Sequence, residues 1–263
     1  AGIISGSVAL LSDAAHMVTD AASIALALGA AHLAQRPASA GYTFGLKRAE
    51  IVSAQLNGAA LLVLAVLLGI EAAGRLFDPP EVEGGIVIVV GVTGALVNVA
   101  AAWRLAKAER RSLNVEGARA HVLTDLYGSV AAVVSGVLVL AAGFARADAL
   151  AALVVVGLML RSGFGLARSS TRVLLEAAPA GLDTEAIGQA LCRAPGIIEV
   201  HDLHVWELTT DFPALSAHVL VAPGDDCHAR RRELEQLLAE RFGVEHTTLQ
   251  VDHERGPELL RIG

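Results

Sequence analysis

Two histidine–aspartate pairs are the residues of this sequence whose types and spacing could bind a metal ion. His16 is followed four residues later by Asp20, and His121 is followed at the same distance by Asp125. In a helix this spacing places both side chains of a pair on one face, about one turn apart. Together the pairs offer two imidazoles and two carboxylates, a full set of four ligands for a divalent ion such as Zn²⁺.

Both pairs lie in segments that are apolar enough to cross a membrane. The chain has 263 residues, of which 54% are hydrophobic and 18% are charged, whereas a soluble domain carries about 25% charged residues. A helix needs roughly 20 apolar residues to cross a bilayer. An ionisable residue inside such a segment is costly and indicates a functional site. The composition and the two pairs therefore predict a metal site within the membrane.

We expect five membrane spans before about residue 170. Lys and Arg gather in the connections at 35–48 and 104–119 and after residue 160, so the positive-inside rule places these parts and the C-terminal region in the cytosol. The first span then runs inward and the fourth outward, and the two His/Asp pairs can meet near the middle of the bilayer. The predicted spans cover residues 1–34, 51–74, 85–103, 115–142 and 149–167.

A different pattern begins at about residue 182, where charged residues and short β-like runs replace the long apolar segments. The predicted order of helix, strand, strand, helix and strand is that of a compact two-layer α+β domain. We therefore divide the chain into a transmembrane domain, 1–168, and a cytoplasmic domain, 169–263. The predicted elements of the second domain are 182–194, 197–208, 214–221, 225–242 and 247–252.

The four ligands suit exchange of a metal ion for protons. Two aspartates and two neutral histidines around Zn²⁺ make a site without net charge, and metal binding requires deprotonated ligands and releases protons. A site between helices at the bilayer midplane is typical of alternating access, so we predict a secondary active transporter. Asn57 and Asn98, also inside predicted spans, either hydrogen-bond between helices or line the pathway.

Three other interpretations stay open at this point. Each pair could simply hydrogen-bond between helices, or the pairs could be a proton relay in a proton-coupled carrier of an organic solute. A membrane metalloenzyme would need an open coordination position and a nearby general base. All four positions can be filled by protein ligands here and the sequence has no His-Glu-x-x-His motif, so we do not expect an enzyme.

Five short motifs are spread over nearly the whole chain. They are SVALLSDAAH at 7–16, YTFG at 42–45, RAE at 48–50, SLNV at 112–115 and HDLHVW at 201–206. Together they resemble the cation diffusion facilitator family, in its zinc-transporting branch. The resemblance implies a homodimer of six-helix subunits, each with a cytoplasmic ferredoxin-like domain. It also implies export of Zn²⁺, or of Co²⁺ or Cd²⁺, from the cytosol by proton antiport. With five spans visible, the first helix of the family pattern is cut short.

The resemblance also assigns residues. His16, Asp20, His121 and Asp125 match the positions of the family's transport site. In the cytoplasmic domain, a regulatory metal site near the dimer interface would use His201, His218, His246 and Asp252; the alternative is that these are surface or sheet-packing residues. Strand alternation places His201 with Leu203 and Val205 on one face and His204 on the other. Residues 225–228 could chelate a metal, but we expect them to begin a helix.

The remaining expectations concern ligands, partners and location. We expect Zn²⁺ as transported substrate and regulatory ion, and no organic cofactor. The expected partners are a second copy of the chain, divalent metal ions, protons and the lipid bilayer. The net charge of −7 argues against nucleic acid. Cys192 and Cys227 fit no disulfide framework, and we expect no signal peptide. The expected location is a bacterial inner membrane.

Overall fold

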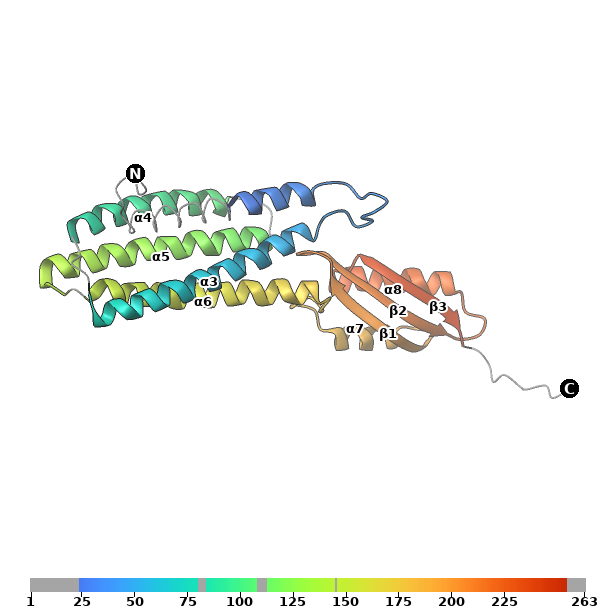
Figure 1. Ribbon diagram of the computed structural model, residues 1–263. Coiled ribbons are helices and arrows are strands. Elements are labelled where there is room, and N and C mark those ends of the chain that lie inside the picture. Colours follow the sequence, from blue (N-terminus) through green and yellow to red (C-terminus); the bar gives the residue numbers. More distant parts are fainter. Residues whose placement is uncertain (1–23, 80–83, 108–112, 145, 255–263) are drawn as a thin grey trace. The chain divides into compact units, whose positions relative to one another are not determined.

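The structure, a computed structural model, describes residues 24–79, 84–107, 113–144 and 146–254. The chain divides into two compact units, Ala1–Thr171 and Arg172–Gly263. Helices make up the described part of the first unit, whereas the second contains a small sheet with two helices (Figure 1).

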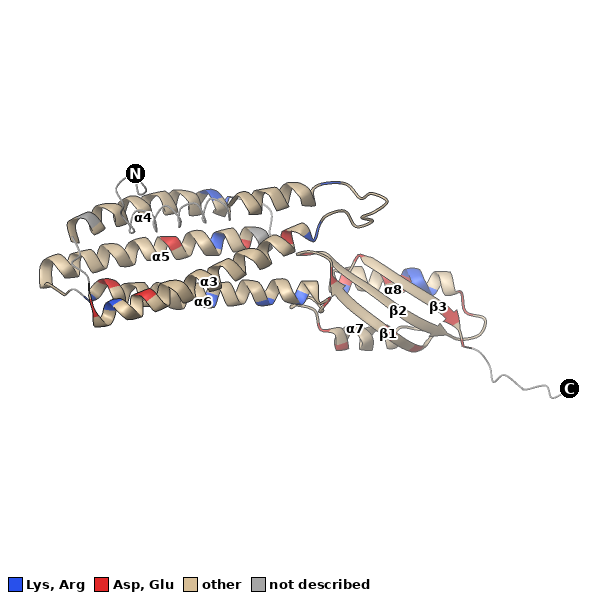
Figure 2. Cartoon of the chain, in the orientation of Figure 1, with Lys and Arg blue, Asp and Glu red and all other residues tan. Residues whose placement is uncertain are grey.

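Long apolar helices dominate the N-terminal unit. They are α3 (Ala49–Phe77), α4 (Gly84–Ala106), α5 (Leu113–Ala142) and α6 (Ala147–Leu174). Among the described residues, these four are long and apolar enough to cross a membrane, with mean hydropathies of 1.7 to 2.2. Most of their length carries no charged side chain (Figure 2). A shorter apolar helix, Ile24–Ala34, precedes them.

These helices confirm the predicted membrane bundle. The predicted spans 51–74, 85–103 and 115–142 lie within α3, α4 and α5. The predicted span 149–167 lies within α6, and α6 continues beyond it to Leu174. Its polar last turns remain helical, and the Ser170 hydroxyl donates a hydrogen bond to the Leu166 carbonyl oxygen at 2.9 Å. Of the predicted first span, only 24–34 lies among the described residues.

Glycines let pairs of these helices approach closely. A Cβ added to Gly58 of α3 would lie 2.9 Å from the Ala167 backbone nitrogen and 3.1 Å from the Gly163 carbonyl oxygen, both on α6. Gly84 of α4 and Gly136 of α5 meet in the same way. Small residues at the crossing of two helices are typical of packing within a membrane. The α3–α6 contact also buries Leu61, Ala65, Val156 and Met159.

The C-terminal unit has the predicted order of helix, strand, strand, helix and strand. Its elements are α7 (Thr184–Cys192), β1 (Ile197–Glu207), β2 (Pro213–Val221), α8 (Cys227–Phe242) and β3 (His246–His253). β1 pairs with β2 in antiparallel fashion, and β2 pairs with β3 in parallel. α7 packs against β1, and α8 packs against β3. The shared core contains Ile187, Leu191, Leu215, Val219, Val221, Leu234 and Leu238.

Aspartates begin both helices of this unit. The Asp183 carboxylate accepts hydrogen bonds from the Glu185 and Ala186 backbone nitrogens, and Asp226 caps α8 in the same way. These backbone hydrogen bonds lower the pKa of Asp226. The prediction that residues 225–228 begin a helix is therefore confirmed. α8 is capped at its C-terminus by Gly243, whose φ of 67° is the left-handed conformation that glycine adopts readily.

A bulge in β1 reverses the predicted alternation of its side chains. The pairing of β1 with β2 shifts register after His201, and Asp202 has a φ of 50°. His201 lies opposite His218, whose neighbours in sequence are buried in the core. Val205 is buried in that core as well, so His201 faces away from it. The predicted grouping of His201 with Leu203 and Val205 is wrong, because the bulge inserts one residue between them.

Candidate metal sites

One predicted His/Asp pair lies on α5. The Nε2 atom of His121 is 3.5 Å from the Oδ2 atom of Asp125, one helical turn away. His121 is buried, and its side chain is 10% exposed, compared with 25% for Asp125. The two groups therefore project from one face of the helix, as the spacing predicts. His16 and Asp20, the other predicted ligands, lie outside the described residues.

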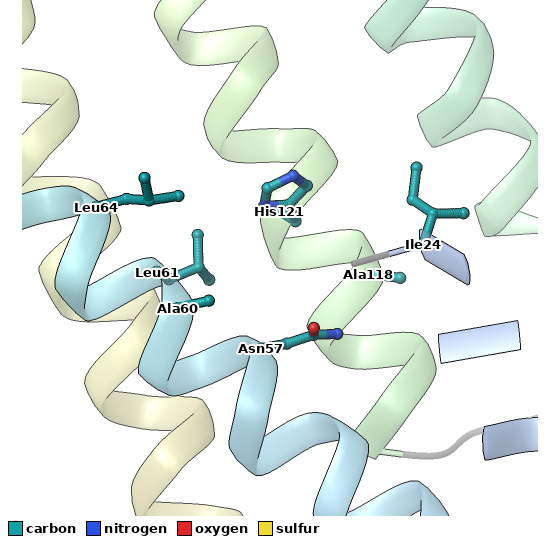
Figure 3. A pocket seen from close by; sticks show the side chains of 7 residues that line it. All are labelled: Ile24, Asn57, Ala60, Leu61, Leu64, Ala118 and His121. Carbon is teal, nitrogen blue, oxygen red and sulfur yellow. The ribbon is translucent and has the colours of Figure 1, made fainter. Parts of the chain in front are cut away.

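A small cavity adjoins the His121 imidazole. Its volume of about 10 Å³ leaves room for one water-sized particle. In Figure 3 the side chains of Asn57 on α3 and His121 on α5 lie on either side of this space. The other residues that line it are apolar: Ile24, Ala60, Leu61, Leu64 and Ala118. An amide and an imidazole thus meet in otherwise apolar surroundings, and both carry atoms that can bind a divalent cation or a water molecule.

Sequence reasoning left the role of Asn57 open, and the structure places it beside the predicted transport residue. Asn57 is 7% exposed and comes from a different helix than His121. Asn98, the other asparagine of the predicted spans, is half-buried on α4 and does not line this cavity. Only the packing of α3 against α5 distinguishes the two asparagines, because both occupy similar positions within apolar sequences.

A second group of metal ligands lies on the sheet of the C-terminal unit. His201, Asp202 and His218 each place a ligand atom within 4.8 Å of the others. The His218 Nδ1 atom is 3.7 Å from Asp202 Oδ2, and the two imidazole rings are 5.3 Å apart, edge to face. Glu199 Oε1 lies 3.3 Å from His201 Nδ1, where a carboxylate can orient the imidazole. Two imidazoles and one carboxylate suit Zn²⁺, which accepts a fourth ligand from water or a second group.

This cluster, which we call the sheet cluster, overlaps only in part with the predicted regulatory site. It contains His201 and His218 and adds Asp202, which sequence reasoning did not select. Within the part of the chain that the structure describes, His246 and Asp252 do not belong to the cluster. His246 begins β3 and contacts the Phe212 ring. Asp252 accepts a hydrogen bond from Gln250 Nε2 at 2.7 Å.

Two family models match the chain, one for each unit. The cation efflux transmembrane domain matches residues 1–175. The cytoplasmic domain of cation efflux proteins matches residues 179–254. The two matches together cover nearly the whole chain, in the order in which the units occur.

Two transporters are similar to this protein over nearly the whole chain. The zinc transporter ZitB of Escherichia coli is 37% identical over 98% of this chain and 83% of its own. A cadmium, cobalt and zinc/H(+)-K(+) antiporter of Bacillus subtilis is 36% identical over 96% and 83%. A solved metal-bound C-terminal domain of the CzcD transporter from Cupriavidus metallidurans is 30% identical, covering 27% of this chain and 99% of that one, with a TM-score of 0.26. The chain belongs to the cation efflux family, also called the cation diffusion facilitator family.

Proposed function

We propose that this protein is a secondary active transporter that exports Zn²⁺ from the cytosol in exchange for protons, with Co²⁺ and Cd²⁺ as further substrates. A member of the cation efflux family is a multi-pass membrane transporter and not an enzyme. The similar proteins are named for zinc or for cadmium, cobalt and zinc, which supports this choice of substrates.

The observation that carries the proposal is the His121–Asp125 pair. It puts an imidazole and a carboxylate 3.5 Å apart on one face of an apolar helix, with His121 against the cavity that Asn57 also lines. A polar pair at this position is costly unless it binds an ion or a proton. In the proposed site, His16 and Asp20 supply the other two ligands.

Exchange follows from the chemistry of the ligands. A bound metal ion requires neutral imidazoles and ionised carboxylates, so protons leave the site when the metal enters. When protons return from the outer side, they compete for the same atoms and release the metal. The four groups titrate as one coupled set, and alternating access to the two sides turns this competition into antiport.

We further propose that the protein is a homodimer in a bacterial inner membrane, with residues 169–263 in the cytosol. The family model that matches this part describes a cytoplasmic domain, and the basic connections support the same orientation. In this arrangement the sheet cluster faces the compartment from which zinc is exported, and we assign to it the binding of a regulatory metal ion.

Zinc uptake into proteoliposomes with an imposed pH gradient tests the transport site. The wild-type protein should move Zn²⁺ and protons in opposite directions, and Asp125→Asn, which keeps the shape of the side chain, should abolish both fluxes. Tyr127→Phe is the matched control, since Tyr127 is exposed on the same helix and should leave both fluxes unchanged. Zinc flux without proton movement would refute the antiport. No zinc flux in the folded wild-type protein would favour an organic-solute carrier.

Isothermal titration with Zn²⁺ tests the sheet cluster. In the Asp125→Asn background, binding at the transport site is weakened, so the remaining heat reports the C-terminal unit. His218→Ala should weaken that binding by about tenfold or more. His204→Ala is the control, because His204 is exposed on β1, the strand that carries His201 and Asp202, and is outside the cluster. Equal effects of the two substitutions would contradict the assignment.

A further inference from the structure

A polar cleft lies between α5 and α6, apart from the His121 cavity. Its volume is about 510 Å³, within the usual range of ligand pockets. Arg161, Ser162, Phe164, Arg168 and Ser169 of α6 line it, and Glu116 lies on the α5 side. A Cβ added to Gly117 would lie 2.9 Å from Leu166 Cδ2, and one added to Gly128 would lie 3.8 Å from Val155 Cγ1, so the two helices run antiparallel along the cleft.

The two arginines lie on one wall of the cleft, two helical turns apart. Their seven-residue separation puts the Cα atoms about 10 Å apart along α6. Both side chains are exposed, and neither forms an ion pair within the described parts of the chain. Two guanidinium groups on one wall therefore present donors that an anion with several oxygens can accept.

Glycine leaves an open position between these arginines. A Cβ added to Gly165 would meet no atom within 4 Å, and Gly165 lines the cleft between Arg161 and Arg168. Ser162 and Ser169 stand beside the same position, and their hydroxyls can donate hydrogen bonds. The α6 wall thus has an open position at Gly165, with an arginine on either side of it along the helix. Such a position suits a phosphate group.

The position of Gly165 along α6 matches the depth of a lipid headgroup in the bilayer. α6 is 28 residues long, longer than the roughly 20 residues that cross the hydrocarbon core of a bilayer. If α6 enters the bilayer at its first turn, which contains Asp148, the core ends near Arg168, and Arg161 lies about 10 Å inside it. An arginine at that depth extends toward the headgroups or binds a counter-anion there.

We propose that this cleft binds the phosphate of a glycerophospholipid from the leaflet at the C-terminal end of α6. The phosphate lies over Gly165 and accepts hydrogen bonds from Arg161 and Arg168. An acyl chain follows the exposed Phe164 ring toward the bilayer centre. Glu116 on the opposite wall excludes a second anion and favours one phosphate per cleft. Basic pockets between membrane helices are recognised sites for phospholipid headgroups.

Native mass spectrometry of the full-length protein in a non-ionic detergent tests the proposal. Dioleoyl phosphatidylglycerol is titrated, and the number and affinity of bound lipids are read directly. The wild-type protein should retain one tightly bound lipid per chain. The double variant Arg161→Gln/Arg168→Gln should weaken this binding by at least about tenfold. Arg119→Gln is the matched control, since Arg119 is exposed on α5 but does not line the cleft.

A second variant separates the site from general attraction by charge. Gly165→Leu fills the open position, keeps both arginines and meets no neighbouring atom at Cβ, so it should block the lipid while the protein still folds. If Arg119→Gln weakens binding as much as the double variant, or if Gly165→Leu binds as the wild type does, the proposal is overturned. Displacement of the lipid by inorganic phosphate alone would also overturn it, in favour of a site for free phosphate.

Discussion

Replacing Gly58 with alanine should loosen the α3–α6 contact and lower the thermal stability of the membrane unit. The new Cβ would lie 2.9 Å from a backbone nitrogen and 3.1 Å from a backbone oxygen of α6. Backbone atoms cannot rotate away as a side chain can, so the helices must separate by about 0.5 Å to restore an ordinary contact. Overpacking of this kind costs about 1–3 kcal/mol.

The helix propensity of alanine offsets part of that cost. Alanine is more favourable than glycine inside a helix by roughly 0.5–1 kcal/mol, so the net loss is about 0–2.5 kcal/mol, with a middle value of about 1 kcal/mol. In a unit of this size, the middle value corresponds to a Tm lower by about 2–4 °C. Gly157→Ala on α6 is the matched control, because its Cβ would meet no atom within 4 Å. It should leave the Tm unchanged or raise it.

Tryptophan fluorescence can follow the membrane unit alone. The chain has two tryptophans, Trp103 on α4 and Trp206 on β1. In a Trp206→Phe background the remaining fluorescence reports the membrane unit during heating in detergent. If Gly58→Ala then melts at or above the temperature of Gly157→Ala, the close approach of the backbones is not what limits this contact, and the reasoning is refuted.

Three further predictions concern single side chains. Burial raises the pKa of Glu207 above its usual 4.5, so the folded state holds the proton more tightly than the unfolded state, and stability falls as pH rises through the window above 4.5. Glu207→Gln should remove this pH dependence of stability, measured in denaturant titrations of the C-terminal unit. If the free energy of unfolding still falls with pH as steeply as in the wild type, the prediction is contradicted. Asp183→Ala removes the α7 cap bonds of 3.0 and 3.1 Å and should cost about 1 kcal/mol, while Asp183→Ser should restore most of it. Asn57→Leu should slow zinc uptake at equal protein level, and Asn98→Leu should not. If the two variants take up zinc at equal rates, Asn57 does not contribute to the transport pathway.

The parts of the fold that follow from local periodicity could be predicted from the sequence. Apolar runs define α3 to α5, and the four-residue spacing places His121 and Asp125 on one face of α5. The end of α6 could not be predicted, because its last turns are polar but remain helical up to Leu174. Charged amphipathic segments and short β-like runs also predicted the order of elements in the C-terminal unit.

The features that depend on contacts between helices or strands could not be predicted from the sequence. The proximity of Asn57 to His121 results from the packing of α3 on α5. The presence of Asp202 in the sheet cluster results from a register shift between β1 and β2, and no glycine marks that shift in the sequence. Simple alternation therefore gave the wrong face for His201, although His201 and His218 were both selected.

The bulge in β1 also bears on how the sheet cluster can change during evolution. Asp202 is the extra residue between His201 and His204, so deleting its single codon would leave β1 regular from Glu199 to Glu207. His201 would still lie opposite His218, and Leu203 would still pack toward the core. The carboxylate could thus be gained or lost in one insertion or deletion that leaves the hydrophobic core intact. In an alignment of relatives, a gap opposite Asp202 would mark a chain that keeps both histidines but has only two of the three ligands.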